Sequence, residues 1–145
     1  MKKILLILLI PFLYFSCEDD PEPRSISFKI DGVAYRSLIP GALLTANQNG
    51  TFDIQINTVE SNYTFNLFID DKPLQNIYGE AIFVFIDDSN TYDSRECTNQ
   101  INMTVTFNEL NINTTRLNGT FSGRVCDAGF EKQLTDGIID NIRLL

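Results

Sequence analysis

The sequence of 145 residues contains no histidine. Histidine is the usual general base of serine and cysteine hydrolases, and its imidazole is the commonest metal ligand in proteins. Its absence excludes Ser-His-Asp and Cys-His catalysis and the common histidine-based metal triads. The sequence therefore predicts a protein that is not an enzyme and needs no cofactor, with catalysis by paired carboxylates as the one alternative left open.

Basic side chains are also scarce. The chain has 11 lysine and arginine residues against 19 aspartate and glutamate residues, which gives a formal net charge of −8. A surface this negative repels nucleic acid and anionic lipid. The sequence also has no basic patch interleaved with aromatic residues, so we expect no nucleic-acid partner.

No apolar run is long enough to span a membrane. The longest, residues 4–15, has 12 residues, whereas a transmembrane helix needs about 20. It follows Lys2 and Lys3 and precedes Ser16 and Cys17. This order is typical of a bacterial lipoprotein signal peptide that is cleaved before Cys17, whose thiol then carries lipid. Secretion without lipid and a retained helix are the alternatives.

The composition turns acidic directly after the cysteine. Two nearby prolines keep this segment extended, so it predicts a solvated tether. We expect a signal peptide at residues 1–16, the lipidated cysteine and tether at residues 17–25, and a single β-rich domain at residues 26–145. Removing 16 of the 145 residues leaves 129, which is one domain's length, and losing two lysines lowers the net charge from −8 to −10. The acidic residues are Glu18, Asp19 and Asp20.

The mature chain has the composition of strands and turns. β-Branched and aromatic residues alternate with polar ones, and Asn, Asp and Gly punctuate the runs. Long helix-period segments, coiled-coil heptads and low-complexity tracts are missing. The sequence predicts an all-β fold, an antiparallel meander of about 8–10 short strands that forms a β-sandwich or a flattened, lipocalin-like barrel.

Four turns set the expected registers. Asp31-Gly32 predicts a type I′ hairpin that pairs Ile30 with Val33 and Phe28 with Tyr35. A two-residue turn is also expected at Asn49-Gly50, a turn of open type at Glu60-Ser61, and a last turn at Asp136-Gly137. They place the following residues opposite one another: Leu43 and Ile56, Thr45 and Ile54, Ile54 and Leu67, Ile56 and Phe65.

The central and C-terminal strands are predicted from their apolar patterns. Residues 81–86 are apolar on both faces, which is typical of a central strand that is covered on both sides. Residues 87–96 are expected to form a polar loop. Further on, Met103 is expected opposite Phe121, with Gly119 and Gly123 on the same face, where they let another strand approach closely.

Cys97 and Cys126 remain as a pair once Cys17 is lipidated. Beyond the inner membrane the compartment permits disulfides. The expected register places Cys97 opposite Asp127, one residue from Cys126, so a local bulge would let the two thiols meet. We therefore predict a Cys97–Cys126 disulfide, with two free thiols as the alternative.

Two strands end in the same four residues, Phe-Ile-Asp-Asp. Their carboxylates are explained by turn chemistry, and a carboxylate-dependent glycan hydrolase is the alternative reading. The four residues are Asp70, Asp71, Asp87 and Asp88. A calcium site at Asp87, Asp88, Asn90 and Asp93 is a further alternative, although their spacing lacks the glycine and terminal glutamate of an EF-hand loop.

Three segments carry a resemblance: FKIDGVAY at residues 28–35, LNGTFSG at residues 117–123 and TDG at residues 135–137. Together with the signal peptide, this chain resembles small surface lipoproteins of the Bacteroidota, a family without established activity. The resemblance implies several acyl chains such as palmitate on Cys17 and export to the cell surface directed by the acidic residues that follow. Tyr14 departs from the family's signal, where leucine is commoner.

These observations predict a non-enzymatic lipoprotein that is held at the outer membrane by Cys17 and acts as a binding or accessory module. Its partner is a glycan, a protein or a small molecule. One alternative is a lipocalin-like carrier, whose interior would have to stay open between residues such as Phe28, Tyr35, Phe65 and Phe121. The other is the carboxylate-dependent hydrolase, which needs two carboxylates in one cleft.

Overall fold

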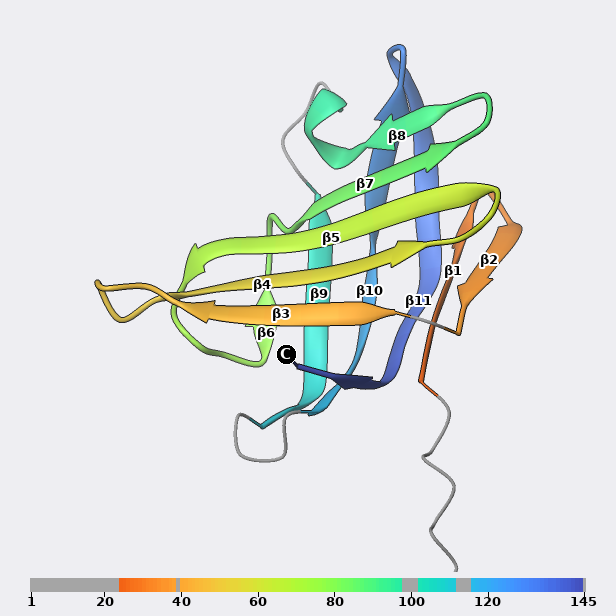
Figure 1. Cartoon of the computed structure of the whole chain (residues 1–145). Helices are drawn as coiled ribbons and strands as arrows, with labels where there is room; N and C mark the ends of the chain where they lie inside the picture. Colours follow the sequence, from red (N-terminus) through yellow and green to blue (C-terminus); the bar gives the residue numbers. More distant parts are fainter. Residues whose placement is uncertain (1–23, 39, 98–101, 112–115, 145) are drawn as a thin grey trace, which may run out of the picture.

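A computed structural model describes residues 24–38, 40–97, 102–111 and 116–144. Within these ranges the chain forms eleven strands and one 3₁₀ turn, and the strands make a single antiparallel sheet that curls into a half-barrel (Figure 1). The all-β prediction is confirmed. The elements are β1 (Ser25–Ile30), β2 (Val33–Ser37), β3 (Gly41–Ala46), β4 (Phe52–Val59), β5 (Tyr63–Lys72), β6 (Ile77–Tyr78), β7 (Ile82–Asp87), β8 (Thr91–Asp93), η1 (Ser94–Glu96), β9 (Met103–Asn111), β10 (Arg116–Asp127) and β11 (Phe130–Arg143).

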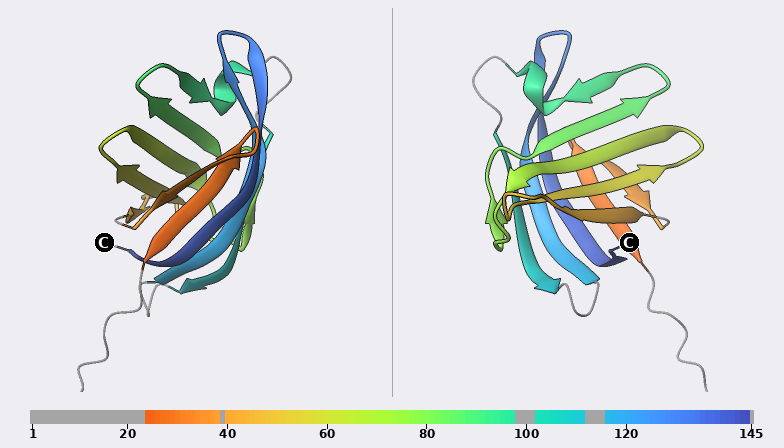
Figure 2. Two further views of the ribbon diagram at one scale, coloured as in Figure 1. Left: turned by 90° about the vertical axis from the view of Figure 1, so that its right-hand side faces the viewer. Right: turned by 60° about the vertical axis from the view of Figure 1, so that its left-hand side comes forward.

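The sheet divides into two halves that face each other. The β1 half contains β2, β1, β11, β10, β9 and β6, and the β5 half contains β8, β7, β5, β4 and β3. Figures 1 and 2 show the strands of the β5 half crossing those of the β1 half. The halves join where Cys126 of β10 pairs with Asp93 of β8. Near the C-terminus a parallel bridge links Ala42 and Leu144.

Hydrogen bonds close the other side of the curl. The hydroxyl of Tyr63 donates to the carbonyl of Arg36 at 2.5 Å, and the hydroxyls of Ser37 and Thr58 lie 2.5 Å apart in a buried position. These contacts tie β2 of the β1 half to β4 and β5 of the β5 half.

Aromatic rings fill the space between the halves. Phe28 is 2% exposed, and its ring centroid lies 5.3 Å from those of Phe65 and Phe83 and 5.4 Å from that of Tyr35. Phe121 lies 6.0 Å away from it. A carrier would leave this volume open, so the interior gives no support to the lipocalin-like alternative.

The first hairpin is confirmed. Ile30 pairs with Val33 and Phe28 with Tyr35, and both turn residues have positive φ, 47° at Asp31 and 84° at Gly32. The Asp31 carboxylate also accepts a 3.0 Å hydrogen bond from the Gln133 amide, which attaches the turn to β11.

The predicted turn at Asn49-Gly50 is wrong by one residue. The Asn47 carbonyl accepts a 3.2 Å hydrogen bond from the Gly50 amide, and Gly50 alone has positive φ, so the loop has three residues. Ala42 therefore lies opposite Ile56, and Leu43 lies opposite Gln55. A shift of one residue turns a side chain to the other face, so Leu43 points outward.

Two further registers are wrong by two residues, which leaves each face unchanged. The turn after β4 lies at Ser61-Asn62, since the Glu60 amide donates to the Tyr63 carbonyl at 2.8 Å. Ile56 therefore pairs with Leu67. In β9 and β10 the expected pairing of Met103 with Phe121 is likewise replaced. The observed pairs are Met103 with Gly123, Val105 with Phe121, and Phe107 with Gly119.

Asp136-Gly137 is a bulge inside β11 and not a turn, which corrects the prediction. Gly137 pairs with Phe121, and the register shifts between Leu134 and Gly137. A Cβ atom on Gly137 would lie 2.6 Å from Cγ of Phe121, so the glycine makes room for that ring. The hairpin turn lies earlier, at Ala128-Gly129, where both residues have positive φ.

Two expectations about the middle of the chain are also wrong. β7 is central in the sheet, but its outer face is not covered, because Ile86 is 45% exposed while Phe83 and Phe85 are fully buried. The expected polar loop at residues 87–96 contains β8 and η1. Short strands such as β6 and β8 raise the strand number above the expected 8–10, to eleven. No helix in the described ranges has the length and hydropathy to cross a membrane.

Candidate functional site

A surface groove of about 420 Å³ lies on the outer face of the β5 half. We call it the outer groove. Its floor comes from four strands, one side chain from each, its rim from two aspartates, and its far wall from η1. The floor residues are Leu43, Gln55, Phe68 and Ile82, the rim residues are Asp53 and Asp70, and the wall residue is Arg95.

Strand pairing builds the floor. Gln55 lies opposite both Leu43 and Phe68, and Phe68 lies opposite Ile82, so the four residues form one row across β3, β4, β5 and β7. Because side chains alternate between faces, the neighbours of this row point inward. Leu67 and Phe83 are at most 1% exposed. The outer groove therefore rests on a filled core.

The rim carboxylate of Asp53 is held in place by two donors. Its Oδ1 accepts 2.8 Å from the Asp71 amide and 3.0 Å from Nδ2 of Asn47. The backbone hydrogen bond from Asp71 is the main reason that the pKa of Asp53 lies below its usual value. Asp53 is therefore ionised and preorganised at neutral pH.

Asp71 lies beside the rim and is fixed in the same way. Its Oδ1 accepts a 2.9 Å hydrogen bond from Nδ2 of Asn49 and another from the Thr51 hydroxyl. These two bonds lower the pKa of Asp71. The hairpin between β3 and β4 thus supplies the donors that hold the acidic rim ionised.

The second rim residue brings two carboxylates together. Asp53 of β4 and Asp70 of β5 both line the outer groove. Glycosidases separate their two carboxyl groups by about 5 to 10 Å so that the sugar or a water fits between them. A glycosidase also needs a general acid, and the lowered pKa of Asp53 is the opposite of what that role requires. The lowered pKa therefore gives no support to the hydrolase alternative.

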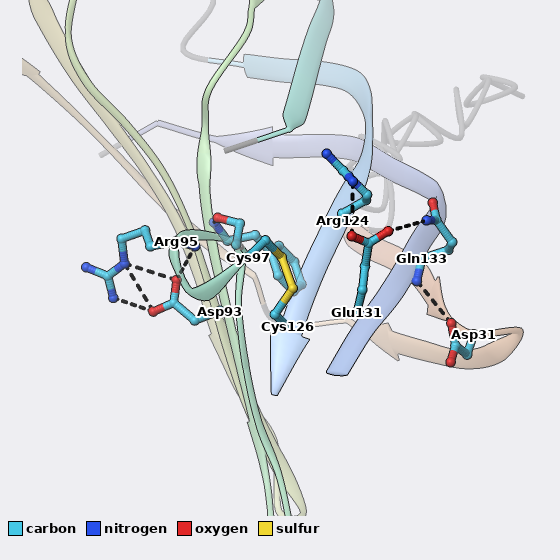
Figure 3. The surroundings of a disulfide bond; sticks show 10 residues. Asp31, Asp93, Arg95, Cys97, Arg124, Cys126, Glu131 and Gln133 are labelled. Carbon is cyan, nitrogen blue, oxygen red and sulfur yellow. Dashed lines mark hydrogen bonds and ion pairs between the residues drawn. A yellow bond between two sulfur atoms is a disulfide. The ribbon is translucent and has the colours of Figure 1, made fainter. Parts of the chain in front are cut away.

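Arg95 forms the far wall through an ion pair with Asp93 (Figure 3). Its Nε donates to both carboxylate oxygens, at 3.0 and 3.1 Å, and Nη2 donates to Oδ2 at 2.5 Å. Burial raises the pKa of Asp93, but the hydrogen bonds from Arg95 outweigh burial and lower it overall. The Arg95 side chain is 56% exposed and that of Asp93 is 9% exposed, so the guanidinium covers the carboxylate.

The predicted disulfide between Cys97 and Cys126 is present, with Cα atoms 5.2 Å apart. It does not extend the β9–β10 hairpin as expected. Cys97 instead follows η1, and Cys126 pairs with Asp93 at the junction of the two halves. The bond therefore fastens η1, and with it Arg95, to β10 (Figure 3).

In the second Phe-Ile-Asp-Asp segment, the carboxylate of Asp87 belongs to a turn. Oδ1 of Asp87 accepts hydrogen bonds from the amides of Ser89 and Asn90, at 2.8 and 2.7 Å, which is turn chemistry. Asp93 forms an ion pair with Arg95. Across the part of the chain that the structure describes, no three His, Cys, Asp or Glu residues gather to hold a metal ion.

The anchor residues lie outside the described residues. Cys17 and the acidic residues Glu18, Asp19 and Asp20 all precede residue 24. Their lipidation and export roles stay predictions.

Sequence reasoning missed the outer groove for a specific reason. The wrong turn at Asn49-Gly50 placed Leu43 opposite Ile56 and thus in the core. A usable signal was Phe68, which lies in the alternating strand β5 on the same face as Thr64 and Asn66. An aromatic residue on the polar face of a half-buried strand points to a contact surface.

Comparisons with protein-family models, with curated proteins and with solved structures gave no match. The fold and the outer groove are therefore the basis for reasoning about function.

Proposed function

We propose that this protein is a lipid-anchored cell-surface module that binds a partner in the outer groove. One observation carries the proposal: an apolar row stays exposed on the outer face of the β5 half although the core beneath it is complete. Leu43 is 48% exposed at one end of that row. Exposed apolar surface rimmed by polar groups is typical of binding sites.

The N-terminal sequence supports a location at the membrane, through a lipid on Cys17. Lys2 and Lys3, the apolar run at residues 4–15 and Ser16-Cys17 support lipidation at Cys17. The proline-containing tether would then hold the domain away from the bilayer. Replacing Cys17 with alanine should release the protein from membranes and abolish labelling with a fatty-acid analogue.

The binding role is tested with arrays of glycans, peptides and small molecules probed with the full chain in detergent micelles. Phe68→Ala removes the aromatic floor, and Phe130→Ala is its matched control, because Phe130 lies in the β10–β11 hairpin and is 74% exposed. At least one compound should bind wild type and Phe130→Ala about tenfold more tightly than Phe68→Ala. Arrays without any such compound would contradict the proposal.

A further inference from the structure

The outer groove combines an uncompensated acidic rim with a floor that is more aliphatic than aromatic. Asp53 and Asp70 form no ion pair within the part of the chain that the structure describes. The positive charge of Lys72 helps to lower the pKa of Asp71, which lies beside the rim. The rim therefore keeps a negative charge that only a cationic partner neutralises.

The floor distinguishes among cationic partners. Leu43, Phe68 and Ile82 are hydrocarbon side chains without a polar atom. Such a surface favours apolar side chains over the hydroxyl-rich ring of a sugar, whose hydroxyls would lose their hydrogen bonds to water. The preferred body of the partner is thus apolar, next to its positive group.

Gln55 interrupts the floor at its centre. Its side-chain amide makes no hydrogen bond to any other residue of the described ranges. An amide offers both a donor and an acceptor, which is the complement of a peptide backbone group. At the far wall the Nη1 donors of Arg95 are not used in its ion pair with Asp93 and can reach a carbonyl oxygen.

We propose that the outer groove binds an extended polypeptide segment in which a lysine or arginine lies next to apolar side chains. The basic group lies against Asp53 and Asp70, the apolar side chains lie on Phe68 and its neighbours, and a backbone amide meets Gln55. The row crosses four strands, and at about 4.8 Å per strand spacing it is about 14 Å long. That length accommodates about four extended residues. This inference rests on the proposed function.

The test is a selection from a random octapeptide library displayed on mRNA, with the full chain in detergent micelles as bait. Peptides enriched on wild type should contain lysine or arginine beside leucine, isoleucine or phenylalanine. The enriched peptides should bind about tenfold more weakly to Asp53→Asn/Asp70→Asn than to wild type, since two charge contacts are lost. Binding to wild type should also weaken as salt rises.

A control variant separates the site from the general acidity of the protein. Asp88→Asn/Asp140→Asn removes the same charge from two exposed positions outside the outer groove. It should bind the enriched peptides as wild type does. The Asp-to-Asn changes keep the Oδ1 acceptor that Asp53 offers to Asp71, and an unchanged urea midpoint confirms that the rim variant is folded.

Three outcomes overturn the inference: no enriched peptide, enrichment without basic residues, or an equal loss of affinity in the rim and control variants. The proposed function fails separately, on the arrays, when no compound depends on Phe68. A glycan that binds wild type and fails to bind Phe68→Ala would leave the proposed function standing and overturn the peptide inference.

Discussion

The two halves of the curled sheet differ in both curvature and outer surface. The β1 half carries register shifts in β1, β10 and β11. Its outer face presents hydroxyls at the centre, where Thr106 pairs with Thr120, and exposed isoleucines, Ile77 and Ile138, on either side of that pair. The β5 half has one register shift, next to Phe52, and its outer face carries the apolar row. Bending is concentrated in the half whose outer face carries hydroxyls at its centre.

The difference separates two tasks. Bulges and glycines let the β1 half wrap around the aromatic core. The β5 half stays more regular, so side chains from four neighbouring strands keep one register and form a continuous surface. A binding surface needs rigid, aligned supports, so the regularity of the β5 half supports the proposed role of the outer groove.

The largest expected effect comes from truncating an inner residue of β5, and it is compared with the truncation of an outer residue of the same strand. Phe65 is fully buried, while Phe68 lies on the outer face of β5. Phe65→Ala should lower the free energy of unfolding by about 4 kcal/mol because it leaves a cavity. Phe68→Ala should cost about 1 kcal/mol, since its site is already partly hydrated. Urea denaturation measures both, and equal losses would mean that the outer row is structural.

The junction of the halves is tested by removing the disulfide. Cys97 and Cys126 are 29 residues apart, so in the chain-entropy model Cys97→Ser/Cys126→Ser should lower stability by about 3.5 kcal/mol. Thermal unfolding with and without reductant gives the same comparison in wild type. If the outer groove binds its partner through Arg95, the double variant should also bind less tightly, whereas an unchanged affinity would show that η1 holds its position unaided.

Curvature of the β1 half depends on close backbone approach. A Cβ atom on Gly123 would lie 2.1 Å from the carbonyl oxygen of Asn102, while Gly79 has no atom within 4 Å of the corresponding position. Gly123→Ala should therefore lower the free energy of unfolding by about 2 kcal/mol, and Gly79→Ala should leave it nearly unchanged. Similar values for the two variants would refute a role for close packing between β9 and β10.

The smallest effect is a pH dependence at the junction. The pKa of Asp93 is lower in the folded protein than its ordinary value of 3.8, so its ion pair contributes fully above that value. The contribution is lost as the pH falls through the lowered pKa. Between about pH 6 and pH 2, wild type should lose about 1 kcal/mol more stability than Asp93→Asn, after allowance for the exposure of Arg95. Parallel urea curves at both pH values would contradict this.

The alternating pattern of the sequence predicts the fold class and most buried faces. Ile54, Ile56, Leu67, Met103 and Val105 all point inward as expected, even where the register is off by two residues. An error of two keeps the face, whereas an error of one reverses it. The pattern therefore predicts the core more reliably than it predicts the pairing.

The remaining errors come from turns whose chemistry fits two structures. Asn-Gly suits a two-residue turn as well as the three-residue loop that is observed, and Asp136-Gly137 suits a turn as well as a bulge. The choice depends on contacts far away in the sequence, such as the ring of Phe121 over Gly137. The outer groove follows from the same long-range choices, because Arg95 reaches it only through the pairing of Asp93 with Cys126.

The disulfide also reports whether β8 and β10 have paired during folding. Cys97 and Cys126 belong to segments that meet only where β8 pairs with β10, so the bond cannot form between native partners until the two halves have come together. A chain whose halves have not met keeps both thiols, and this distinguishes it chemically from a finished molecule. Oxidation at this position therefore fixes the Arg95 wall of the outer groove in place.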